Sequence, residues 1–343
     1  MGRALCALAS LLMVACTRTS TATAPSIREE QVQFRNGDVT LAGTLFIPTK
    51  PGRYPAVVLF HGSGPQARYP ERARWFAEQG MAALTYDKRG MGESTGDFRK
   101  VSFLELSSDG IAGVELLKSR TDIDPKRIGV WGLSQGGWLG PLAASQSNDV
   151  AFVIAVSGPG VSPGEQMVYY YACELRAQGV PEAQIEEASA LRRDVWSYVS
   201  TGARFDEAKK EVARARSRPW YKQVAAQRDT IFDSFQNAST LKNRAWFKSE
   251  VNYDPVLALR KLTVPALFFF GDADQLVPVP KSVDVIRRTL TESGHRDFTI
   301  QVFPGADHVM NLASENGQEI PAYRETMKSW LATHHFIFEK ANR

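Results

Sequence analysis

The strongest constraint on the fold of this chain is a serine held between glycines. Residues 130–137 read V-W-G-L-S-Q-G-G, which places Ser134 in a G-x-S-x-G pattern. An apolar run over residues 127–131 predicts a buried strand before the serine, and small residues over 139–145 predict a helix after it. Such a sharp strand-to-helix turn strains the dihedral angles of the serine and needs small neighbours. The pattern alone is weak, so its meaning depends on partner residues elsewhere.

A serine hydroxyl becomes a good nucleophile beside a base, and the base needs a carboxylate to orient it. The chain has five histidines. His308 lies in a loop after a strand-like run over residues 298–303, and catalytic groups are usually displayed on such loops. We therefore predict that His308 is the base. The others are expected to be solvated or too close to a tight turn: His61, His295, His334 and His335.

The carboxylate is expected at the end of another strand. Residues 267–278 read L-F-F-F-G-D-A-D-Q-L-V-P and supply two candidates. This stretch resembles the G-x-x-D-x-x-V-P segment of alpha/beta hydrolases, in which the second acidic position is the triad acid, and the resemblance favours Asp274 over Asp272. The order Ser134, Asp274, His308 also distinguishes alpha/beta hydrolases from the two best-known serine protease folds.

A tetrahedral intermediate needs donors for its oxyanion, normally two backbone N–H groups. Gln135, directly after the serine, is expected to supply one of them. Residues 61–65, H-G-S-G-P, resemble the H-G-x loop of alpha/beta hydrolases. That resemblance points to Ser63 for the second donor, with Gly64 as the alternative.

A further loop completes the resemblance. Residues 86–94, Y-D-K-R-G-M-G-E-S, are similar to the D-x-R-G-x-G-x-S loop that alpha/beta hydrolases often carry after the fourth strand. We interpret Asp87 and Arg89 as structural residues that brace this glycine-rich loop. Together the motifs cover residues 55–310 in the order expected of the family.

The chain is thus predicted to be an α/β protein with the alpha/beta-hydrolase fold. This fold implies an eight-stranded, mostly parallel sheet with helices on both faces and, here, an inserted helical cap. Strand-like runs occur at residues 31–34, 40–47, 56–60, 82–86, 128–131, 151–156, 266–270 and 298–302.

The alternating pattern breaks over residues 162–250, where charged helical runs with aromatic positions follow the sixth strand. We predict a cap here, inserted between core segments 27–161 and 251–343. Caps in this fold set specificity and exclude water from the reacting centre. Each aromatic residue of the cap is better explained singly by packing, and some are expected to face the substrate: Tyr169, Tyr170, Trp196, Trp220, Phe232 and Trp246.

Residues 1–15 are predicted to be a signal peptide, in which Arg3 precedes an apolar segment too short to span a membrane. The sequence L-M-V-A-C that ends at Cys16 resembles a bacterial lipobox, whose cysteine becomes the lipidated amino terminus. Residues 16–26 would then be a flexible tether, and the protein would be anchored in the bacterial periplasm. An ordinary secretory signal and a soluble periplasmic protein are the alternative.

Composition argues against other classes of function. The formal net charge is +4, and +3 without Arg3, which is too small to indicate nucleic-acid binding. The sequence has no metal-like cluster of Cys and His, so we expect neither a metal nor another cofactor. With Cys6 removed and Cys16 lipidated, only Cys173 would remain, and we interpret it as a small core residue.

The sequence therefore predicts a serine hydrolase that cleaves the carboxylic ester of a small molecule through an acyl-enzyme on Ser134. Serine at this position argues against epoxide hydrolases and haloalkane dehalogenases, which use an aspartate there. A prolyl-aminopeptidase-like enzyme ranks second and a thioesterase third. A ligand-binding surface lipoprotein without catalysis is the alternative outside the enzymes. The peptidase would need carboxylates for the substrate amine, and the candidates are Glu165, Glu174, Glu186 and Glu187.

Overall fold

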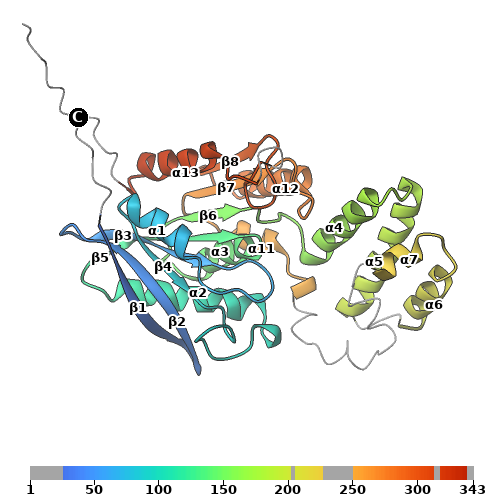
Figure 1. The fold of residues 1–343 in the computed structure, drawn as a ribbon, viewed down its shortest axis with the longest axis horizontal. Helices are drawn as coiled ribbons and strands as arrows, with labels where there is room; N and C mark the ends of the chain where they lie inside the picture. The colour runs from blue at the N-terminus through green and yellow to red at the C-terminus, as the bar shows by residue number, and fades with distance from the viewer. Residues whose placement is uncertain (1–25, 202–204, 227–249, 313–316, 338–343) are drawn as a thin grey trace, which may run out of the picture.

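Eight strands form one sheet, each at one of the predicted strand-like runs (Figure 1). The structure is a computed structural model that describes residues 26–201, 205–226, 250–312 and 317–337. The strand order in the sheet is β1-β2-β4-β3-β5-β6-β7-β8. The strands are β1 (Ile27–Asn36), β2 (Val39–Pro48), β3 (Tyr54–Phe60), β4 (Ala82–Tyr86), β5 (Ile123–Leu133), β6 (Val153–Val156), β7 (Ala266–Gly271) and β8 (Phe298–Phe303).

The sheet is mostly parallel, as predicted. Strand β2 pairs antiparallel with β1 and with β4, and every other pairing is parallel. Parallel neighbours bring the carboxyl ends of their strands to one edge of the sheet. The loops that follow β3, β4, β5, β7 and β8 therefore meet at this edge, and they carry the predicted site residues.

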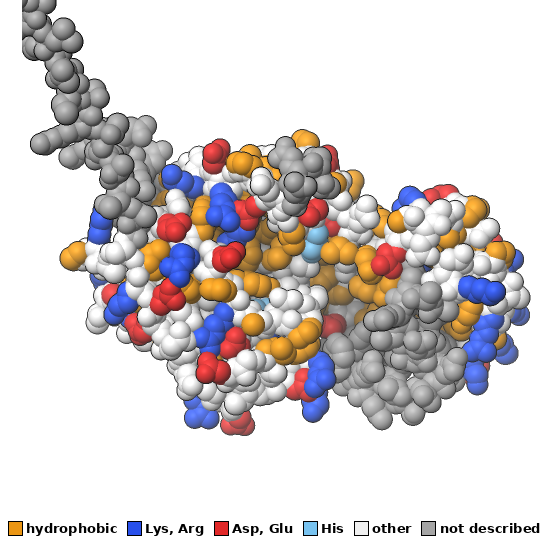
Figure 2. Space-filling model, in the orientation of Figure 1, with side chains coloured by type: hydrophobic (Ala, Val, Ile, Leu, Met, Phe, Trp, Pro, Cys, Tyr) orange, Lys and Arg blue, Asp and Glu red, His pale blue; other side chains and the backbone are white. Residues whose placement is uncertain are grey.

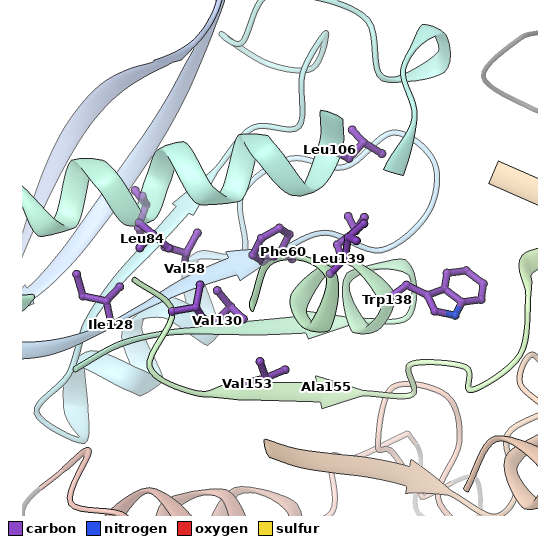
Figure 3. Packing of buried hydrophobic residues seen from close by; sticks show 14 of the residues in the cluster. Val58, Phe60, Leu84, Leu106, Ile128, Val130, Trp138, Leu139, Val153 and Ala155 are labelled. Atoms are coloured by element: carbon purple, nitrogen blue, oxygen red, sulfur yellow. The ribbon is translucent and has the colours of Figure 1, made fainter. Parts of the chain in front are cut away.

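Helices cover both faces of the sheet because its strands are apolar on both sides. In β3, Val58 and Phe60 belong to one buried cluster, while Val57 and Leu59 belong to the other. Figure 3 shows Val58, Phe60 and Val130 on the side that α2 and α3 cover. One face packs against α1 (Pro70–Glu78) and α13 (Pro321–Thr333), and the other against α2 (Phe103–Lys118), α3 (Gln135–Gln146), α11 (Pro255–Leu259) and α12 (Val279–Glu292).

The start of α2 illustrates how local sequence sets these helices. Ser102 accepts a hydrogen bond from the Glu105 N–H, and the Glu105 carboxylate accepts one from the Ser102 N–H at 2.8 Å. This capping box satisfies donors that the first helical turn leaves without partners. A single 3-10 turn, η1 (Phe98–Lys100), precedes it.

Among the described residues of the predicted cap, four helices follow β6, and Figure 1 shows them beside the sheet-containing part of the molecule. They are α4 (Pro163–Ala177), α5 (Glu182–Thr201), α6 (Phe205–Ala215) and α7 (Tyr221–Ala226). They share an apolar cluster of their own, which includes Leu175, Val195 and Trp220. In the same orientation, Figure 2 shows hydrophobic side chains gathered where these helices meet the sheet-containing part of the molecule.

Several predictions fall on residues that the structure does not describe. These are the signal peptide with Cys16, most of the tether, and the cap residues Phe232 and Trp246. Within the described ranges, no helix has both the length and the apolar character needed to cross a membrane.

Candidate active site

Ser134 stands at a strained turn between β5 and α3. Its φ is 57° and its ψ is −113°, a combination that non-glycine residues rarely adopt. A Cβ on Gly132 would lie 2.1 Å from the Gly136 carbonyl oxygen, and one on Gly136 would lie 2.8 Å from the Phe60 carbonyl oxygen. The turn therefore requires glycine on both sides of the serine, as the sequence pattern indicates.

The loops after β7 and β8 bring Asp274 and His308 together. His308 Nδ1 donates to Asp274 Oδ2 at 2.8 Å, which leaves Nε2 available to accept a proton. The other oxygen of Asp274 accepts from the N–H groups of Leu276 and Val277, so the buried carboxylate is held in place. Asp272 is exposed and accepts instead from the Gly305 N–H at 2.6 Å. The geometry thus separates the two carboxylates in the way that the sequence resemblance favours.

The end of β6 ties the serine turn to the histidine loop. The Ser134 N–H donates to the Val156 carbonyl at 2.8 Å, and the Ser157 hydroxyl donates to the His308 carbonyl at 2.8 Å. Leu133 and Val309, the neighbours of Ser134 and His308 in the chain, line the same cavity. In the described part of the chain, the Ser134 hydroxyl makes no hydrogen bond, and catalytic hydrogen bonds are often formed only once substrate binds.

Three of the other histidines have structural partners, and His335 is exposed, as predicted. His61 is buried, and its Nε2 donates to the Tyr86 carbonyl at 2.6 Å. Burial lowers the pKa of His61 to about 4, so its ring stays neutral near pH 7. His295 and His334 are half-buried rather than solvated, and a ring nitrogen of each bonds to a backbone carbonyl, that of Val264 for His295 and that of Trp330 for His334.

Among the described residues, the two amides predicted for the oxyanion hole have no hydrogen-bond acceptor. Neither the Ser63 N–H nor the Gln135 N–H donates a hydrogen bond to any residue that the structure describes. Gln135 is the first residue of α3, where helix geometry leaves the N–H unpaired. The Gly62 N–H is already used, since it donates to the Tyr69 hydroxyl at 3.1 Å. Gly64 stays the alternative to Ser63.

A buried lysine, which the sequence analysis did not single out, lies behind these amides. Lys88 Nζ donates to the Gly62 carbonyl at 3.0 Å, the Gly64 carbonyl at 3.2 Å and Gln135 Oε1 at 2.7 Å. Gln135 Nε2 in turn donates to Glu250 at 3.0 Å. Burial lowers the pKa of Lys88 to about 8 and raises that of Glu250 to about 7. The position of Lys88 inside the D-x-R-G loop was a usable signal, whereas nothing in the sequence marked Glu250.

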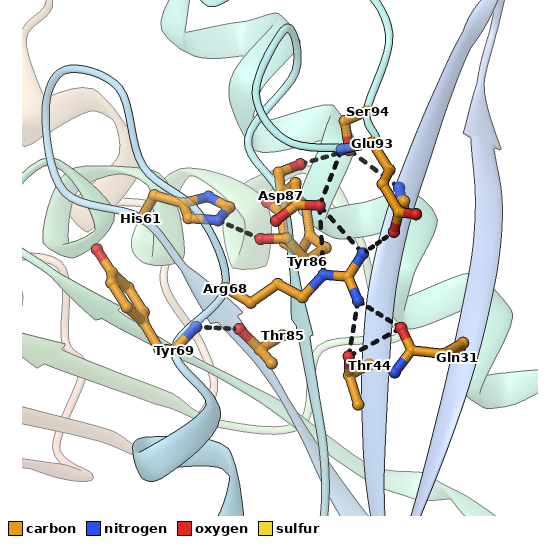
Figure 4. A network of polar contacts seen from close by, with 11 residues as sticks. Gln31, Thr44, His61, Arg68, Tyr69, Thr85, Tyr86, Asp87, Glu93 and Ser94 are labelled. Atoms are coloured by element: carbon orange, nitrogen blue, oxygen red, sulfur yellow. Dashed lines mark hydrogen bonds and ion pairs between the residues drawn. The ribbon is translucent and has the colours of Figure 1, made fainter.

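The neighbours of Lys88 brace the loop, as interpreted from the sequence. Figure 4 shows the Arg68 guanidinium against Asp87, with an Nη2–Oδ2 distance of 3.1 Å. Arg89 makes two bonds to Asp109 of α2, at 2.7 and 2.5 Å, and both side chains are buried. These pairs fix the loop to the sheet and to α2.

A cavity of about 510 Å³ opens beside the serine turn. Its charged groups are largely paired: Arg72 contacts Glu319 at 2.5 Å and stacks on the rings of Trp131 and Tyr323, with centroid distances of 5.4 and 5.0 Å. Arg324 pairs with the same glutamate. The residues that line it are Arg68, Tyr69, Pro70, Glu71, Arg72, Trp131, Leu133, Val156, Val309, Asn311, Glu319, Tyr323 and Arg324.

The aromatic residues of the predicted cap lie either near the candidate site or inside the apolar cluster of the helices. The Tyr169 hydroxyl donates to the Asp274 carbonyl at 3.3 Å, so α4 contacts the loop of the carboxylate. Tyr170 donates to Glu174, and Trp196 and Trp220 are buried in the apolar cluster that α4 to α7 share. Tyr169 therefore lies at the candidate site, while these two tryptophans pack helices α4 to α7 against one another.

The carboxylates considered for an amine substrate are engaged with other side chains. Glu165 pairs with Lys281, Glu174 accepts from Tyr170, Glu186 pairs with Arg193, and Glu187 accepts from Trp220.

Cys173 is half-buried, which corrects its interpretation as a core residue. No group of three or more His, Cys, Asp or Glu side chains in the described ranges is arranged to hold a metal ion.

Comparison with known proteins places this site in context. The sequence profile of a family described as serine aminopeptidase, S33, matches residues 53–313. Esterase EstD of Thermotoga maritima is 26% identical over 300 residues, which are 84% of this chain and 62% of EstD. Quorum-quenching protein AidA of Acinetobacter baumannii is 34% identical over 131 residues, 37% of this chain and 42% of AidA. The chain thus spans less than two thirds of the length of these curated relatives.

Solved structures share the fold. Esterase Pf2001 of Pyrococcus furiosus matches with a TM-score of 0.58 and 17% identity, over 90% of this chain and 91% of that one. The alpha/beta hydrolase GrgF of Penicillium matches with a TM-score of 0.58 and 21% identity, over 90% and 99% of the two chains. The predicted alpha/beta-hydrolase fold is therefore confirmed.

Proposed function

We propose that this chain, which belongs to the alpha/beta-hydrolase family matched by the serine aminopeptidase S33 profile, cleaves carboxylic esters of small molecules through an acyl-enzyme on Ser134. It is an esterase-like serine hydrolase by its homology to esterases. The observation that carries the proposal is the 2.8 Å hydrogen bond between His308 and Asp274, at the sheet edge where Ser134 is held in its strained turn.

In this mechanism, His308 Nε2 takes the proton of the Ser134 hydroxyl as the oxygen attacks the ester carbonyl. Asp274 holds the imidazole in the required tautomer and stabilises its charged form. The N–H groups of Ser63 and Gln135 receive the oxyanion, and His308 then protonates the departing alcohol. Water repeats the sequence on the acyl-enzyme and releases the acid.

The cavity beside Leu133 and Val309 is the site we assign to one side of the ester. Its aromatic walls and paired charges favour an uncharged apolar or aromatic group over an anion, because Glu319 already neutralises much of the charge of Arg72 and Arg324. We also propose that residues 162–250 form a cap over the site. The contact between Tyr169 and the Asp274 loop supports this assignment.

An aminopeptidase with the same triad is the second candidate. Glu250 favours it, because a half-buried carboxylate joined to Gln135 could receive a substrate amine. Lys88 opposes it, since its positive charge lies on the other side of Gln135 and would repel an ammonium group. The remaining candidate carboxylates are paired elsewhere, so we rank the esterase first and a thioesterase third.

Turnover of matched substrates tests the proposal. Wild-type protein is expected to hydrolyse p-nitrophenyl esters across a series of acyl lengths, and Ser134→Ala is expected to have lost this activity. Amino-acid p-nitroanilides and acyl thioesters of the same acyl groups serve as comparisons. A higher kcat/KM for prolyl p-nitroanilide than for every ester would replace the esterase with the aminopeptidase.

Export and lipid anchoring are also part of the proposal. They rest on the lipobox-like sequence that ends at Cys16. Metabolic labelling with palmitate in a bacterial host is expected to mark wild-type protein and not Cys16→Ser. If both proteins are secreted without label, residues 1–15 are an ordinary secretory signal and the proposed lipid anchor is wrong.

A further inference from the structure

Lys88 is a buried cation, and among the described residues all the hydrogen bonds of its ammonium group go to residues of the loop 62–64 and to Gln135, which carry the proposed oxyanion-hole donors. Its side chain is 2% exposed, and its ammonium group has three protons to donate. Three acceptors receive them: the carbonyls of Gly62 and Gly64, and Gln135 Oε1. The Lys88 ammonium also lies 5.1 Å from the centre of the Phe98 ring, a further favourable contact for a cation.

The bond to Gly62 bears directly on Ser63. The Gly62 carbonyl and the Ser63 N–H belong to one planar, trans peptide group and point in opposite directions. Holding the Gly62 oxygen at 3.0 Å therefore fixes the direction of the Ser63 N–H. Polarising that carbonyl also strengthens the N–H as a donor. The bond to Gln135 restrains the residue whose backbone N–H is the second donor.

We propose that Lys88 is a positioning residue of the oxyanion hole, which holds both donor amides through Gly62 and Gln135, and that Glu250 supports it from the far side of the Gln135 amide. This inference rests on the proposed function. Gln135 accepts from Lys88 and donates to Glu250, so the three side chains form one chain of hydrogen bonds.

The charge of Lys88 also favours the transition state. A positive charge in a buried site stabilises negative charge that develops nearby more strongly than it would in water. The ester carbonyl in the bound substrate carries no full charge, whereas the tetrahedral oxygen does. Loss of Lys88 is therefore expected to lower kcat far more than it changes KM.

The groups around Lys88 determine how this effect depends on pH. These groups are Glu250, which lies beyond Gln135, His61 of the loop after β3, and Asp87 and Arg89, which flank Lys88 in the chain. Burial lowers the pKa of Lys88 to about 8, and the negative charge of Glu250 opposes this change. His61 is already neutral in this range because its pKa is lowered to about 4. Lys88 is charged below about pH 8 and neutral above it, so kcat is expected to fall as pH rises through 8.

The first experiment compares Lys88→Met with Lys118→Met, a control at a half-exposed lysine that pairs with Asp149. Loss of Lys88 is expected to lower kcat for a p-nitrophenyl ester on the order of 10²-fold, as removal of an oxyanion donor does. KM stays near the wild-type value, and the affinity for an alkyl boronic acid, which mimics the tetrahedral state, falls in parallel with kcat. Folded Lys88→Met with wild-type kcat and boronate affinity would overturn the inference.

The second experiment measures the pH dependence of kcat in Glu250→Gln. It tests the inference even if Lys88→Met does not fold. Removing the negative charge of Glu250 lowers the pKa of Lys88 further, so the alkaline fall in kcat moves to lower pH. An unchanged alkaline limb would contradict the proposed link. Failure of the function itself is distinguishable, because wild-type protein would then show no ester hydrolysis, whereas failure of this inference alone leaves wild type active.

Discussion

The two sides of Ser134 are built in different ways. On one side, Asp274 and His308 stand on loops directly after β7 and β8, each in a short recognisable sequence pattern. On the other side, Lys88 and Glu250 come from distant parts of the chain and meet at Gln135. The first side supplies the groups proposed to move protons, and the second holds the amides proposed to receive charge. The difference teaches that motif spacing reveals displayed groups better than it reveals the buried groups that support them.

The largest effect is expected on the proton-moving side. His308→Ala removes the base, so kcat for an aryl ester should fall on the order of 10⁶-fold, with the fold retained. Steady-state kinetics and circular dichroism measure the two quantities. His295→Ala is the matched control and should keep the wild-type rate, because His295 lies on a different loop. Comparable losses in both variants would contradict the assignment.

A smaller effect separates the two carboxylates of the β7 loop. Asp274→Asn keeps the shape of the side chain but favours the wrong tautomer of His308, so kcat should fall on the order of 10⁴-fold. Asp272→Asn changes a carboxylate that bonds to the Gly305 N–H and should cost little activity. Stopped-flow hydrolysis of the same ester measures both variants. The reverse ranking would show that Asp272 is the acid.

Substitutions on the side that supports the oxyanion-hole amides are expected to lower kcat less than substitutions of Asp274 or His308. Gln135→Ala keeps the backbone N–H but breaks the link between Lys88 and Glu250, so kcat should fall about tenfold, the cost of losing hydrogen bonds to charged groups. The pH profile of kcat should change as well. A loss as severe as that of His308→Ala would mean that the two sides do not differ as described.

Arg89, the neighbour of Lys88, should affect the fold rather than the chemistry. Arg89→Met leaves the Asp109 carboxylate buried without its ion-pair partner, although Asn36 still donates to it, and the free energy of unfolding should fall by about 3 kcal/mol. Urea denaturation measures this loss, and kcat per folded molecule should stay close to that of wild type. A selective loss of kcat in stable protein would instead place Arg89 in the site.

Much of the fold was predictable because each layer leaves a local signal. All eight strands coincide with strand-like runs in the sequence, and the signal is clearest for central parallel strands such as β7 over residues 266–271, which are apolar because they are buried on both faces. The serine turn was predictable for a similar reason: the close approach of Gly132 to the Gly136 backbone admits no side chain. Local steric requirements of this kind are written in the sequence itself.

The remainder of the site depends on contacts between distant segments. Lys88 looks like a surface residue in sequence, and only the packing of its loop against residues 61–65 buries it. No motif in the sequence marks Glu250, and its role depends on a hydrogen bond from Gln135, a residue far away in the chain. For Trp196 and Trp220 taken singly, the sequence favoured packing over a place in the pocket, and both are buried in an apolar cluster.

The central claim is that Ser134 is the acyl-accepting nucleophile. Its most direct test is mass-spectrometric mapping of folded protein after reaction with a fluorophosphonate probe, which traps activated serines covalently. The account predicts one adduct, on the peptide that contains Ser134, and none in Ser134→Ala. Folded wild-type protein without an adduct, or equal labelling of Ser134→Ala, would contradict it.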